Sequence, residues 1–289
     1  MPELPEVETT ISEIKPEILG KKIVDVFCTE KKIVKKPKFE KFVEQIKGKK
    51  IQKIWRKGKY IVFELSGGKV MLLHLKLTGH LLVGKWKKVK KNFLPLTPGP
   101  ISTDPINKFV RLVFVLNNKK MLALSDLRKF AKIEFGDKEE IFSSKEFQKI
   151  GPDPFSVNFE QFKQILLKKK KKRIKETLMD QELVSGIGNI YSDEILWEAK
   201  IHPLKKVSEL KDEDFKNIFL ATRKILKKAI SLKGESISDF RRPSGEKGYF
   251  DTERKVYKRE GENCLRCSEK IKRIKIKGRS AYFCPSCQK

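Results

Sequence analysis

The first eight residues of the chain, MPELPEVE, bring together three groups able to do covalent chemistry. Removal of Met1 before a small residue would leave Pro2 with a free secondary amine. An α-amino group has a pKa of about 7.7–8.0, against about 10.4 for lysine, so much more of it is unprotonated near neutral pH. Such an amine can add to C1′ of a sugar and form an iminium, which acidifies the C2′ proton and permits strand cleavage by elimination. Glu3 and Glu6 are close enough in sequence to move the protons.

The same residues also fit an ordinary acidic helix start. Pro5 suits the first helical turn, and the helix dipole favours Glu6 and Glu8 there. The two interpretations are compatible, because one helix can both begin here and carry the reacting groups.

Two Cys-x-x-Cys pairs, separated by sixteen residues, lie near the end of the chain: Cys264, Cys267, Cys284 and Cys287. Four thiolates at this spacing match a closed tetrahedral zinc site. Disulfides are the alternative, and a reducing compartment disfavours them. A closed site has no open coordination position, so one structural zinc ion is predicted. It would hold a hairpin over residues 270–283 and present the turn that contains Arg279.

Charge is the strongest bulk property. The 289 residues carry a formal net charge of +29, with 36% charged and 39% hydrophobic residues. So positive a surface attracts polyanions, which makes nucleic acid the expected partner. Lysine and glutamate enrichment also marks some heat-adapted proteins, so part of the excess can have another origin. With no apolar run long enough to span a membrane and no secretory signal, we expect a soluble cytoplasmic protein.

The hydrophobic pattern predicts an α+β protein. Val7, Ile11, Ile14 and Ile18 have helical spacing, with Pro16 and Gly20 as the positions expected to end the helix. Eight short strands joined by hairpins predict a β-sandwich, at residues 22–28, 51–56, 60–65, 69–75, 80–83, 109–116, 121–125 and 131–135. Helices are predicted at residues 159–167, capped by Asn158, and at 174–184, 190–200 and 212–232.

These elements predict four segments. Residues 1–135 form the N-terminal sandwich domain, and residues 136–157, with the Gly151-Pro152-Asp153-Pro154 turn, form a linker. Residues 158–233 form the helical domain. Residues 234–289 contain loops and the cysteine-bearing hairpin.

The segment from Pro2 to Thr9 resembles the opening of the formamidopyrimidine-DNA glycosylases, bifunctional enzymes that excise oxidised purines and then cut the strand. The resemblance extends over essentially the whole chain, with the same order of β-sandwich, helix-two-turns-helix module and zinc finger. It implies that Pro2 forms the Schiff base, that Glu3 is an acid/base and that Glu6 assists. If this resemblance is set aside, an ordinary acidic helix start explains these residues about as well as a catalytic set does.

The resemblance assigns roles to four further polar residues. Lys59 would contact phosphate and help proton transfer in the elimination, and Arg279 would grip phosphates and serve the second elimination. Asn189, after Gly186-Ile187-Gly188 at a helix start, would bind phosphate. Lys170, in the run of lysines at residues 168–172, would contact DNA. By themselves, these lysines would be read as solvated charges and the glycines as a common turn.

The family fills the gap left by a flipped nucleotide with three side chains. Here Leu77 stands where a methionine is expected, while Arg128 and Phe130 are retained. Leucine keeps the apolar wedge and loses the flexibility of methionine. Asn107 stands where a DNA-contacting histidine is expected. Residues 234–240 and 245–250 resemble the loop that covers the extruded base.

We therefore predict a bifunctional glycosylase and abasic-site lyase that removes 8-oxoguanine and formamidopyrimidines from damaged double-stranded DNA by β,δ-elimination, as a monomer. One alternative is the related endonuclease VIII type, which acts on oxidised pyrimidines. The other is a non-catalytic zinc protein that binds nucleic acid; it explains the charge and the finger but not the Pro2, Glu3 and Glu6 set.

Overall fold

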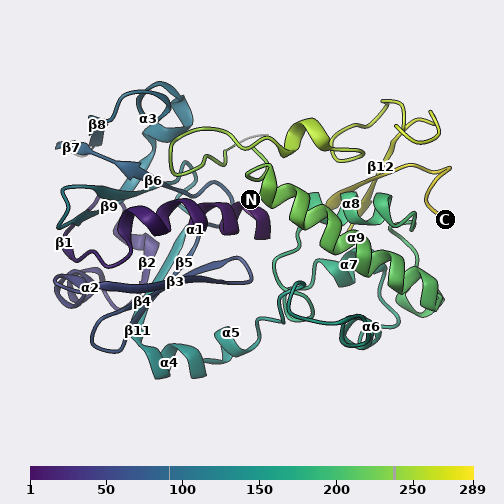
Figure 1. Cartoon of the computed structure of the whole chain (residues 1–289), viewed down its shortest axis with the longest axis horizontal. Coiled ribbons are helices and arrows are strands. Elements are labelled where there is room, and N and C mark those ends of the chain that lie inside the picture. Colours follow the sequence, from purple (N-terminus) through teal and green to yellow (C-terminus); the bar gives the residue numbers. More distant parts are fainter. Residues whose placement is uncertain (91, 237–238) are drawn as a thin grey trace. The chain divides into compact units, whose positions relative to one another are not determined.

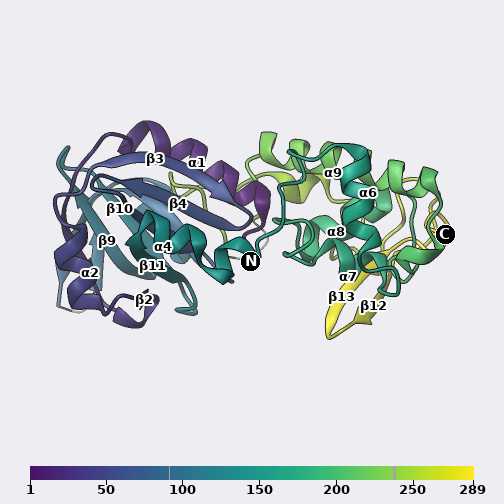
Figure 2. The ribbon, with the colours of Figure 1, turned by 90° about the horizontal axis from the view of Figure 1, so that it is seen from below.

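The structure is a computed structural model and describes residues 1–90, 92–236 and 239–289. The chain divides into two compact units (Figures 1 and 2). The first contains Met1–Gln148 and Leu232–Asp251, and the second contains Lys149–Ser231 and Thr252–Lys289. None of the helices in the described ranges is long and apolar enough to cross a membrane.

Two main sheets form the first unit, and α1 (Leu4–Ile18) contacts strands of both. The four-stranded sheet has the order β1 (Ile23–Cys28), β9 (Val110–Leu116), β10 (Met121–Ser125) and β6 (His80–Gly84). The five-stranded sheet has the order β2 (Val34–Lys36), β11 (Lys132–Asp137), β5 (Lys69–His74), β4 (Tyr60–Leu65) and β3 (Ile51–Lys57). All neighbours are antiparallel except β2 and β11.

The core of this unit lies between the sheets. Side chains such as Phe63 and Phe114, from opposite sheets, share it with the apolar stripe of α1 and with Phe42 of α2 (Phe39–Ile46). Burial of the α1 stripe explains why the helix runs through Pro16, which was expected to end it, as far as Ile18. Packing of Ile14 and Ile18 offsets the backbone hydrogen bond that proline cannot make.

The sandwich and all eight predicted strands are confirmed, and the 60–65 and 121–125 predictions match β4 and β10 residue for residue. The expected total of eight is too low, because β2 makes nine strands in the two sheets as described. A separate hairpin of β7 (Trp86–Val89) and β8 (Asn92–Pro95) was also not predicted. The lysine-rich sequence of β7 and the three residues of β2 give too short a pattern for the alternation to be recognised.

The second unit contains four main helices and a C-terminal hairpin. The helices are α6 (Phe159–Leu167), α7 (Ile174–Leu178), α8 (Asn189–Glu198) and α9 (Asp212–Ser231), and the hairpin pairs β12 (Lys272–Ile276) with β13 (Arg279–Phe283). Asn158 caps α6 as predicted, with its Oδ1 accepting from Gln161 N at 2.9 Å. The predicted helix 174–184 is too long. Leu183 and Val184 are buried in the following turn. Their apolar side chains continue the hydrophobic spacing of the helix, which led to the longer prediction.

Short helices complete the chain. They are α3 (Pro100–Thr103), α4 (Lys138–Ser143) and α5 (Lys145–Gln148), with 3₁₀ turns at Lys31–Ile33, Pro105–Lys108, Val207–Glu209 and Phe250–Glu253. The boundaries of the units differ from those of the predicted segments, since residues 149–157 of the predicted linker group with the second unit and residues 232–233 with the first. Residues 136–148, predicted as part of a linker, extend β11 and form α4 and α5 in the first unit. Residues 234–251, predicted to belong with the finger, also group with the first unit.

Candidate active site and zinc-binding cluster

The start of α1 holds two carboxylates in buried positions. Glu3 is 2% exposed and Glu6 is 1% exposed, and Pro2 is buried directly before them. The Glu6 carboxylate accepts two backbone hydrogen bonds, from Glu3 N to Oε2 at 2.7 Å and from Glu235 N to Oε1 at 2.8 Å. Both donors are backbone groups, so they fix the orientation of the carboxylate.

Gly234 approaches the same carboxylate. A Cβ atom at this position would lie 2.8 Å from Glu6 Oε1, and the backbone has a φ of +81°. Both observations require glycine, because a side chain would clash and L-residues rarely adopt this conformation. The backbone at residues 234–235 is therefore shaped around Glu6.

Lys59 lies in the tight turn between β3 and β4, after Gly58, which has a φ of +57°. Lys59 is only 6% exposed. Arg56 pairs with Glu8 of α1 through Nε and Oε2 at 2.8 Å, and its Nη1 donates to Gly58 O at 3.2 Å. One arginine side chain thus connects the helix of the two carboxylates to the turn that carries the lysine.

Three predicted DNA-contacting residues lie on two loops that a hydrogen bond joins. Thr78, next to Leu77, donates through its Oγ1 to Asp126 Oδ1 and accepts from Arg128 N at 3.0 Å. Leu77 is 37% exposed and Phe130 is 54% exposed, and Arg128 is exposed as well. The Thr78–Asp126 contact therefore joins two loops of the first unit that expose a leucine, an arginine and a phenylalanine.

Asn107 is placed differently from the other predicted contacts. It is 1% exposed, and its Nδ2 donates to Pro100 O at 2.8 Å and to Gly245 O at 3.0 Å. Its Oδ1 lies 3.0 Å from His80 Nε2. Burial lowers the pKa of His80 to about 4, so this imidazole is neutral at neutral pH. In this structure Asn107 holds the segment around Gly245 and does not present its amide to solvent.

In the second unit, the turn before α8 carries the predicted phosphate-binding residues. Gln181 shapes this turn, because its Oε1 accepts from Gly186 N at 2.9 Å and its Nε2 donates to Ile187 O at 2.7 Å. Asn189 is the first residue of α8, and its Oδ1 is buried without a hydrogen-bond partner among the residues described. Lys170 is exposed in the turn after α6.

Arg279 begins β13, after the two-residue turn Lys277-Gly278, in which both residues have positive φ. It is exposed and lines a 260 Å³ pocket together with Lys172, Lys175, Glu176, Met179, Asp180, Ile276 and Lys277. A cationic pocket of this kind suits an anionic group.

A buried ion pair fixes the hairpin to the helices of its unit. Lys175 Nζ lies 2.7 Å from Asp193 Oδ1 and donates to Ser280 O at 2.9 Å, and Tyr282 N donates to Asp193 Oδ2 at 3.1 Å. Both charged side chains are at most 1% exposed. Burial raises the pKa of Asp193 to about 7, although the Lys175 ammonium opposes that rise.

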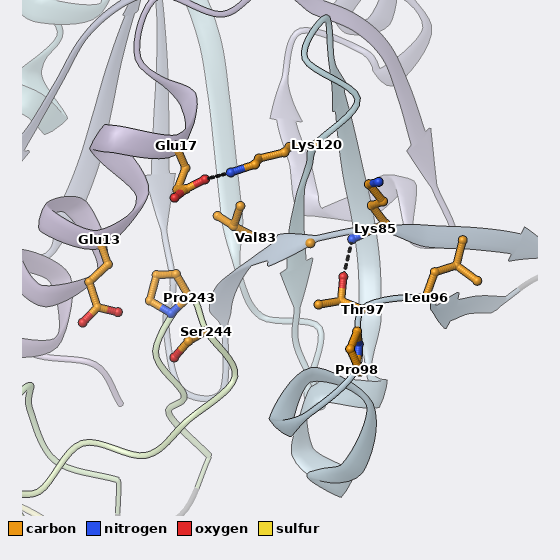
Figure 3. Close-up of a pocket in the computed structure, with 11 residues that line it drawn as sticks. Glu13, Glu17, Val83, Lys85, Leu96, Thr97, Pro98, Lys120, Pro243 and Ser244 are labelled. Carbon is orange, nitrogen blue, oxygen red and sulfur yellow. Dashed lines mark hydrogen bonds and ion pairs between the residues drawn. The ribbon is translucent and has the colours of Figure 1, made fainter.

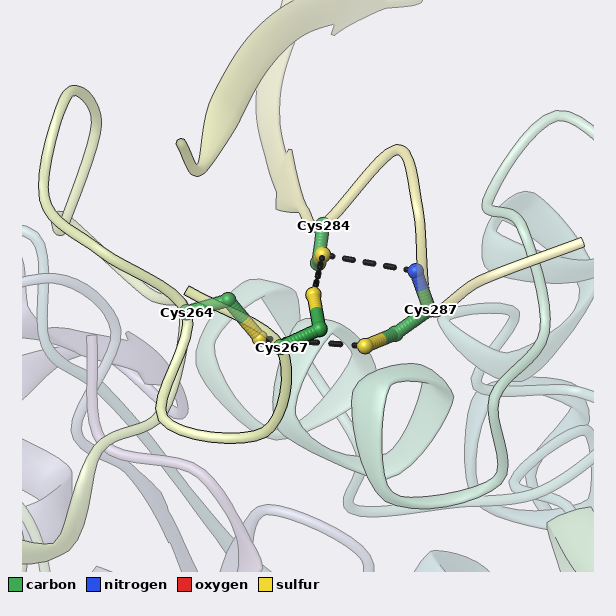
Figure 4. Close-up of side chains that lie close together, drawn as sticks. All are labelled: Cys264, Cys267, Cys284 and Cys287. Carbon is green, nitrogen blue, oxygen red and sulfur yellow. Dashed lines mark hydrogen bonds between the residues drawn. The ribbon is translucent and has the colours of Figure 1, made fainter. Parts of the chain in front are cut away.

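The four cysteines converge at the base of the hairpin (Figure 4). Their sulfur atoms all lie within 4.8 Å of one another, with Cys264–Cys287 at 3.9 Å and Cys267–Cys284 at 3.4 Å. A tetrahedral zinc ion with Zn–S bonds of about 2.3 Å requires sulfur separations of about 3.8 Å. Backbone N–H groups of Arg266 and Cys287 donate to the sulfurs of Cys264 and Cys284, which is typical support for thiolate ligands. The cluster fits a structural zinc ion.

Three domain models of one protein family match successive parts of the chain. Residues 1–133 match the formamidopyrimidine-DNA glycosylase N-terminal domain, residues 150–241 its H2TH domain, and residues 261–289 the zinc finger found in FPG and IleRS. The chain belongs to the formamidopyrimidine-DNA glycosylase family.

Relatives and solved structures in this family match over the full length. The chain is 36% identical over 290 residues to the formamidopyrimidine-DNA glycosylase of Carboxydothermus hydrogenoformans, covering 100% of both. The relative from Lactococcus lactis is 36% identical over 289 residues, covering 100% of this chain and 99% of that one. Crystal structures of Lactococcus lactis Fpg superpose with TM-scores of 0.85, in complex with DNA containing an abasic site, and 0.86, for a mutant in complex with Fapy-dG DNA. Both are 34% identical and cover at least 99% of each chain.

Several residues that shape the family's site in this chain were not predicted. They are Arg56, Thr78, Asp126, Lys175, Asp193 and Gly234. No local pattern distinguishes them, because their roles depend on contacts between segments that are distant in sequence. Of the predicted covering loop, residues 237 and 238 lie outside the described residues.

Proposed function

We propose that this chain is a base-excision DNA glycosylase that removes oxidised purines, such as 8-oxoguanine and formamidopyrimidines, from duplex DNA. The observation that carries the proposal is the buried Glu3–Glu6 pair behind Pro2, in a chain that matches the family from end to end. The solved relatives are complexes with Fapy-dG and abasic DNA, which supports the same class of substrate here.

In the first step, the unprotonated amine of Pro2 attacks C1′ and the bond from C1′ to the base nitrogen breaks. The base leaves with its bonding electrons and takes up a proton, and the nitrogen of Pro2 loses its proton. The C1′–O4′ bond then breaks, O4′ takes up a proton, and the opened sugar becomes an iminium on Pro2. Glu3 is the proposed proton donor at the sugar. Glu6, held by the N–H groups of Glu3 and Glu235, keeps a fixed negative charge beside the developing cation.

We further propose that the chain is an abasic-site lyase. Loss of the C2′ proton from the iminium expels the 3′ phosphate, and a second elimination expels the 5′ phosphate, which leaves a one-nucleotide gap. Lys59 is proposed to serve the first elimination, since a nearly buried lysine at a turn is well suited to proton transfer. Arg279 is proposed to serve the second.

The remaining residues are proposed to bind DNA. Leu77, Arg128 and Phe130, exposed together, would fill the space left by the flipped nucleotide. Asn189 and Lys170 would contact phosphates. Zinc bound by the four cysteines would keep β12 and β13 folded and so present Arg279. Asn107 is buried and would act indirectly, through the Gly245 segment. A monomer working in the cytoplasm is part of the proposal.

The test is single-turnover reaction with duplex DNA that carries 8-oxoguanine opposite cytosine, with base release and strand ends measured separately. Glu3→Gln should slow base release by roughly 10²–10⁴-fold, the usual contribution of a general acid/base. Glu44→Gln, on the exposed surface of α2, is the matched control and should react like the wild type. Arg279→Gln should accumulate the product of the first elimination.

Other outcomes would select another function. Release of an oxidised pyrimidine but not of 8-oxoguanine would indicate an activity of the endonuclease VIII type. Tight binding of damaged duplex with no reaction on any lesion, even with the N-terminus confirmed by mass spectrometry, would indicate a non-catalytic DNA-binding protein.

A further inference from the structure

The β7–β8 hairpin is a firmly anchored projection of the first unit. Trp86 and Phe93 are 4% and 6% exposed and belong to an apolar cluster with Leu82, Ile101, Val110, Val113 and Ala123. Lys88 lies over the ring of Phe27 on the same inner side, 5.5 Å from its centroid. The hairpin therefore has a fixed inner face and presents its other face to solvent.

The outer face follows from the register. Trp86 pairs with Pro95, Lys87 with Leu94, Lys88 with Phe93 and Val89 with Asn92. Leu96 N donates to Lys85 O at 2.8 Å and continues the ladder. Because side chains alternate along a strand, the face opposite Trp86 and Phe93 carries Lys85, Lys87, Val89, Asn92, Leu94 and Leu96. We call these six residues the outer hairpin face.

This face exposes apolar groups that the fold does not use. Leu94 is 52% exposed and Leu96 is 61% exposed, and Val89 is 37% exposed. Single exposed leucines are common, but three aliphatic side chains on one small hairpin form a patch. Such a patch, bordered by charges, is typical of a protein-binding surface.

The charges on this face are not balanced. Lys85 and Lys87 are exposed and make no ion pair within the described part of the chain. The nearby carboxylates are already engaged, because Glu17 pairs with Lys120 and Glu13 pairs with Arg242 at 2.7 Å. The local charge available to a ligand is therefore positive.

A pocket of 570 Å³ continues this face (Figure 3). Lys85 and Leu96 line it at the end of the outer hairpin face, and Val83, Pro98 and Pro243 supply further apolar wall. Glu13 and Glu17 also line the pocket, and both carboxylates are engaged in the ion pairs with Arg242 and Lys120. Lys85 N donates to Thr97 Oγ1 at 2.8 Å, and Val83 N donates to Pro243 O at 2.9 Å, so hydrogen bonds fix two of its sides. The volume is ample for a bulky apolar side chain.

We propose that the outer hairpin face and this pocket bind an acidic peptide segment of a partner protein that carries bulky apolar side chains. Lys85 beside Leu96 and Lys87 opposite Leu94 alternate charge and apolar surface, so carboxylates can meet the lysines while apolar side chains cover the leucines. A DNA strand would use the lysines and leave the leucines exposed to water, which favours the peptide. The site is distinct from the proposed catalytic residues Glu3, Glu6 and Lys59.

Fluorescence anisotropy with a labelled peptide of alternating aspartate and leucine tests this proposal on the full-length, zinc-loaded protein. We expect saturable binding that is at least about tenfold weaker in Leu94→Ser/Leu96→Ser, as for central interface side chains. Lys85→Gln/Lys87→Gln should weaken binding and reduce its salt dependence. Leu220→Ser, an equally exposed leucine on α9, is the matched control and should bind like the wild type. Excision of 8-oxoguanine by all three variants should stay at the wild-type rate, which also shows that they are folded.

Three results would overturn the proposal. Equal affinity for a peptide of aspartate and serine would show non-specific attraction to a basic protein. Unchanged binding in both double variants would place the peptide elsewhere. Competition by undamaged duplex, with loss of duplex affinity in the leucine variant, would assign the face to nucleic acid.

Discussion

Replacement of Lys175 by methionine should destabilise the second unit strongly. The lysine is 1% exposed and its partner Asp193 is 0% exposed, with 2.7 Å between Nζ and Oδ1. Removal of one partner of a buried ion pair typically costs about 3–5 kcal/mol, because the buried Asp193 carboxyl must then either stay charged without compensation or take up a proton. Methionine fills a similar volume, so the loss measures charge pairing and not a cavity.

The chain offers a matched control for burial. Lys163 and Asp212 form the same type of pair at 2.9 Å, but the aspartate side chain is 82% exposed. Lys163→Met should cost less than about 1 kcal/mol, as exposed pairs usually do. In Lys175→Met/Asp193→Leu the orphaned charge is gone, so part of the loss should be recovered. The recovery of stability stays incomplete, because Tyr282 N and Ser280 O each lose a hydrogen-bond partner. Each unsatisfied buried group costs about 1–3 kcal/mol.

Native-state hydrogen exchange is the appropriate assay, because amides in α8 and β13 report on the second unit directly. The opening free energy of these amides should fall by about 3–5 kcal/mol in Lys175→Met. A fall below about 1 kcal/mol, equal to that of the Lys163 control, would refute the reasoning. So would a double variant that is no more stable than Lys175→Met.

Three further predictions concern pH, zinc and a helix cap. Burial lowers the pKa of His80 from 6.5 to about 4, so the unfolded chain takes up this proton first as the pH falls. The free energy of unfolding should therefore drop by roughly 3 kcal/mol between pH 6.5 and 4, and His80→Gln should flatten that part of the curve measured by urea titration. Cys267→Ser should lower the zinc content below one per chain by atomic absorption and expose β12 and β13 to proteolysis, whereas Cys28→Ser should change neither. Asn158→Ala should cost about 1 kcal/mol in the exchange of α6 amides, because it removes the bond to Gln161 N.

Local patterns were enough to predict much of the fold. The hydrophobic patterns of β4, β10 and α6 predicted the bounds of these elements residue for residue. Hairpin turns mark the ends of the strands, and a capping asparagine marks the start of the helix. The same rules failed where burial came from the tertiary structure. Leu183 and Val184 are buried by a turn that Gln181 holds, and nothing in the local sequence distinguishes this from a longer helix.

The candidate site shows the same limit. Residue types and resemblance pointed to Glu3, Glu6 and Lys59, but not to what positions them. The N–H group that fixes Glu6 Oε1 belongs to Glu235, 229 positions away in sequence. Asn107 was expected at the DNA surface and is buried, because its amide suits the His80 and Gly245 partners that the fold brings to it.

Borohydride trapping tests the central claim most directly, with duplex that carries 8-oxoguanine opposite cytosine and protein of verified N-terminus. Reduction of the iminium would leave a covalent protein–DNA adduct, located at Pro2 by peptide mass spectrometry, and the adduct should be absent in Pro2→Gly and in protein that retains Met1. An adduct at a lysine, or one of equal yield in the Met1-retaining protein, would contradict the assignment of Pro2 as the nucleophile.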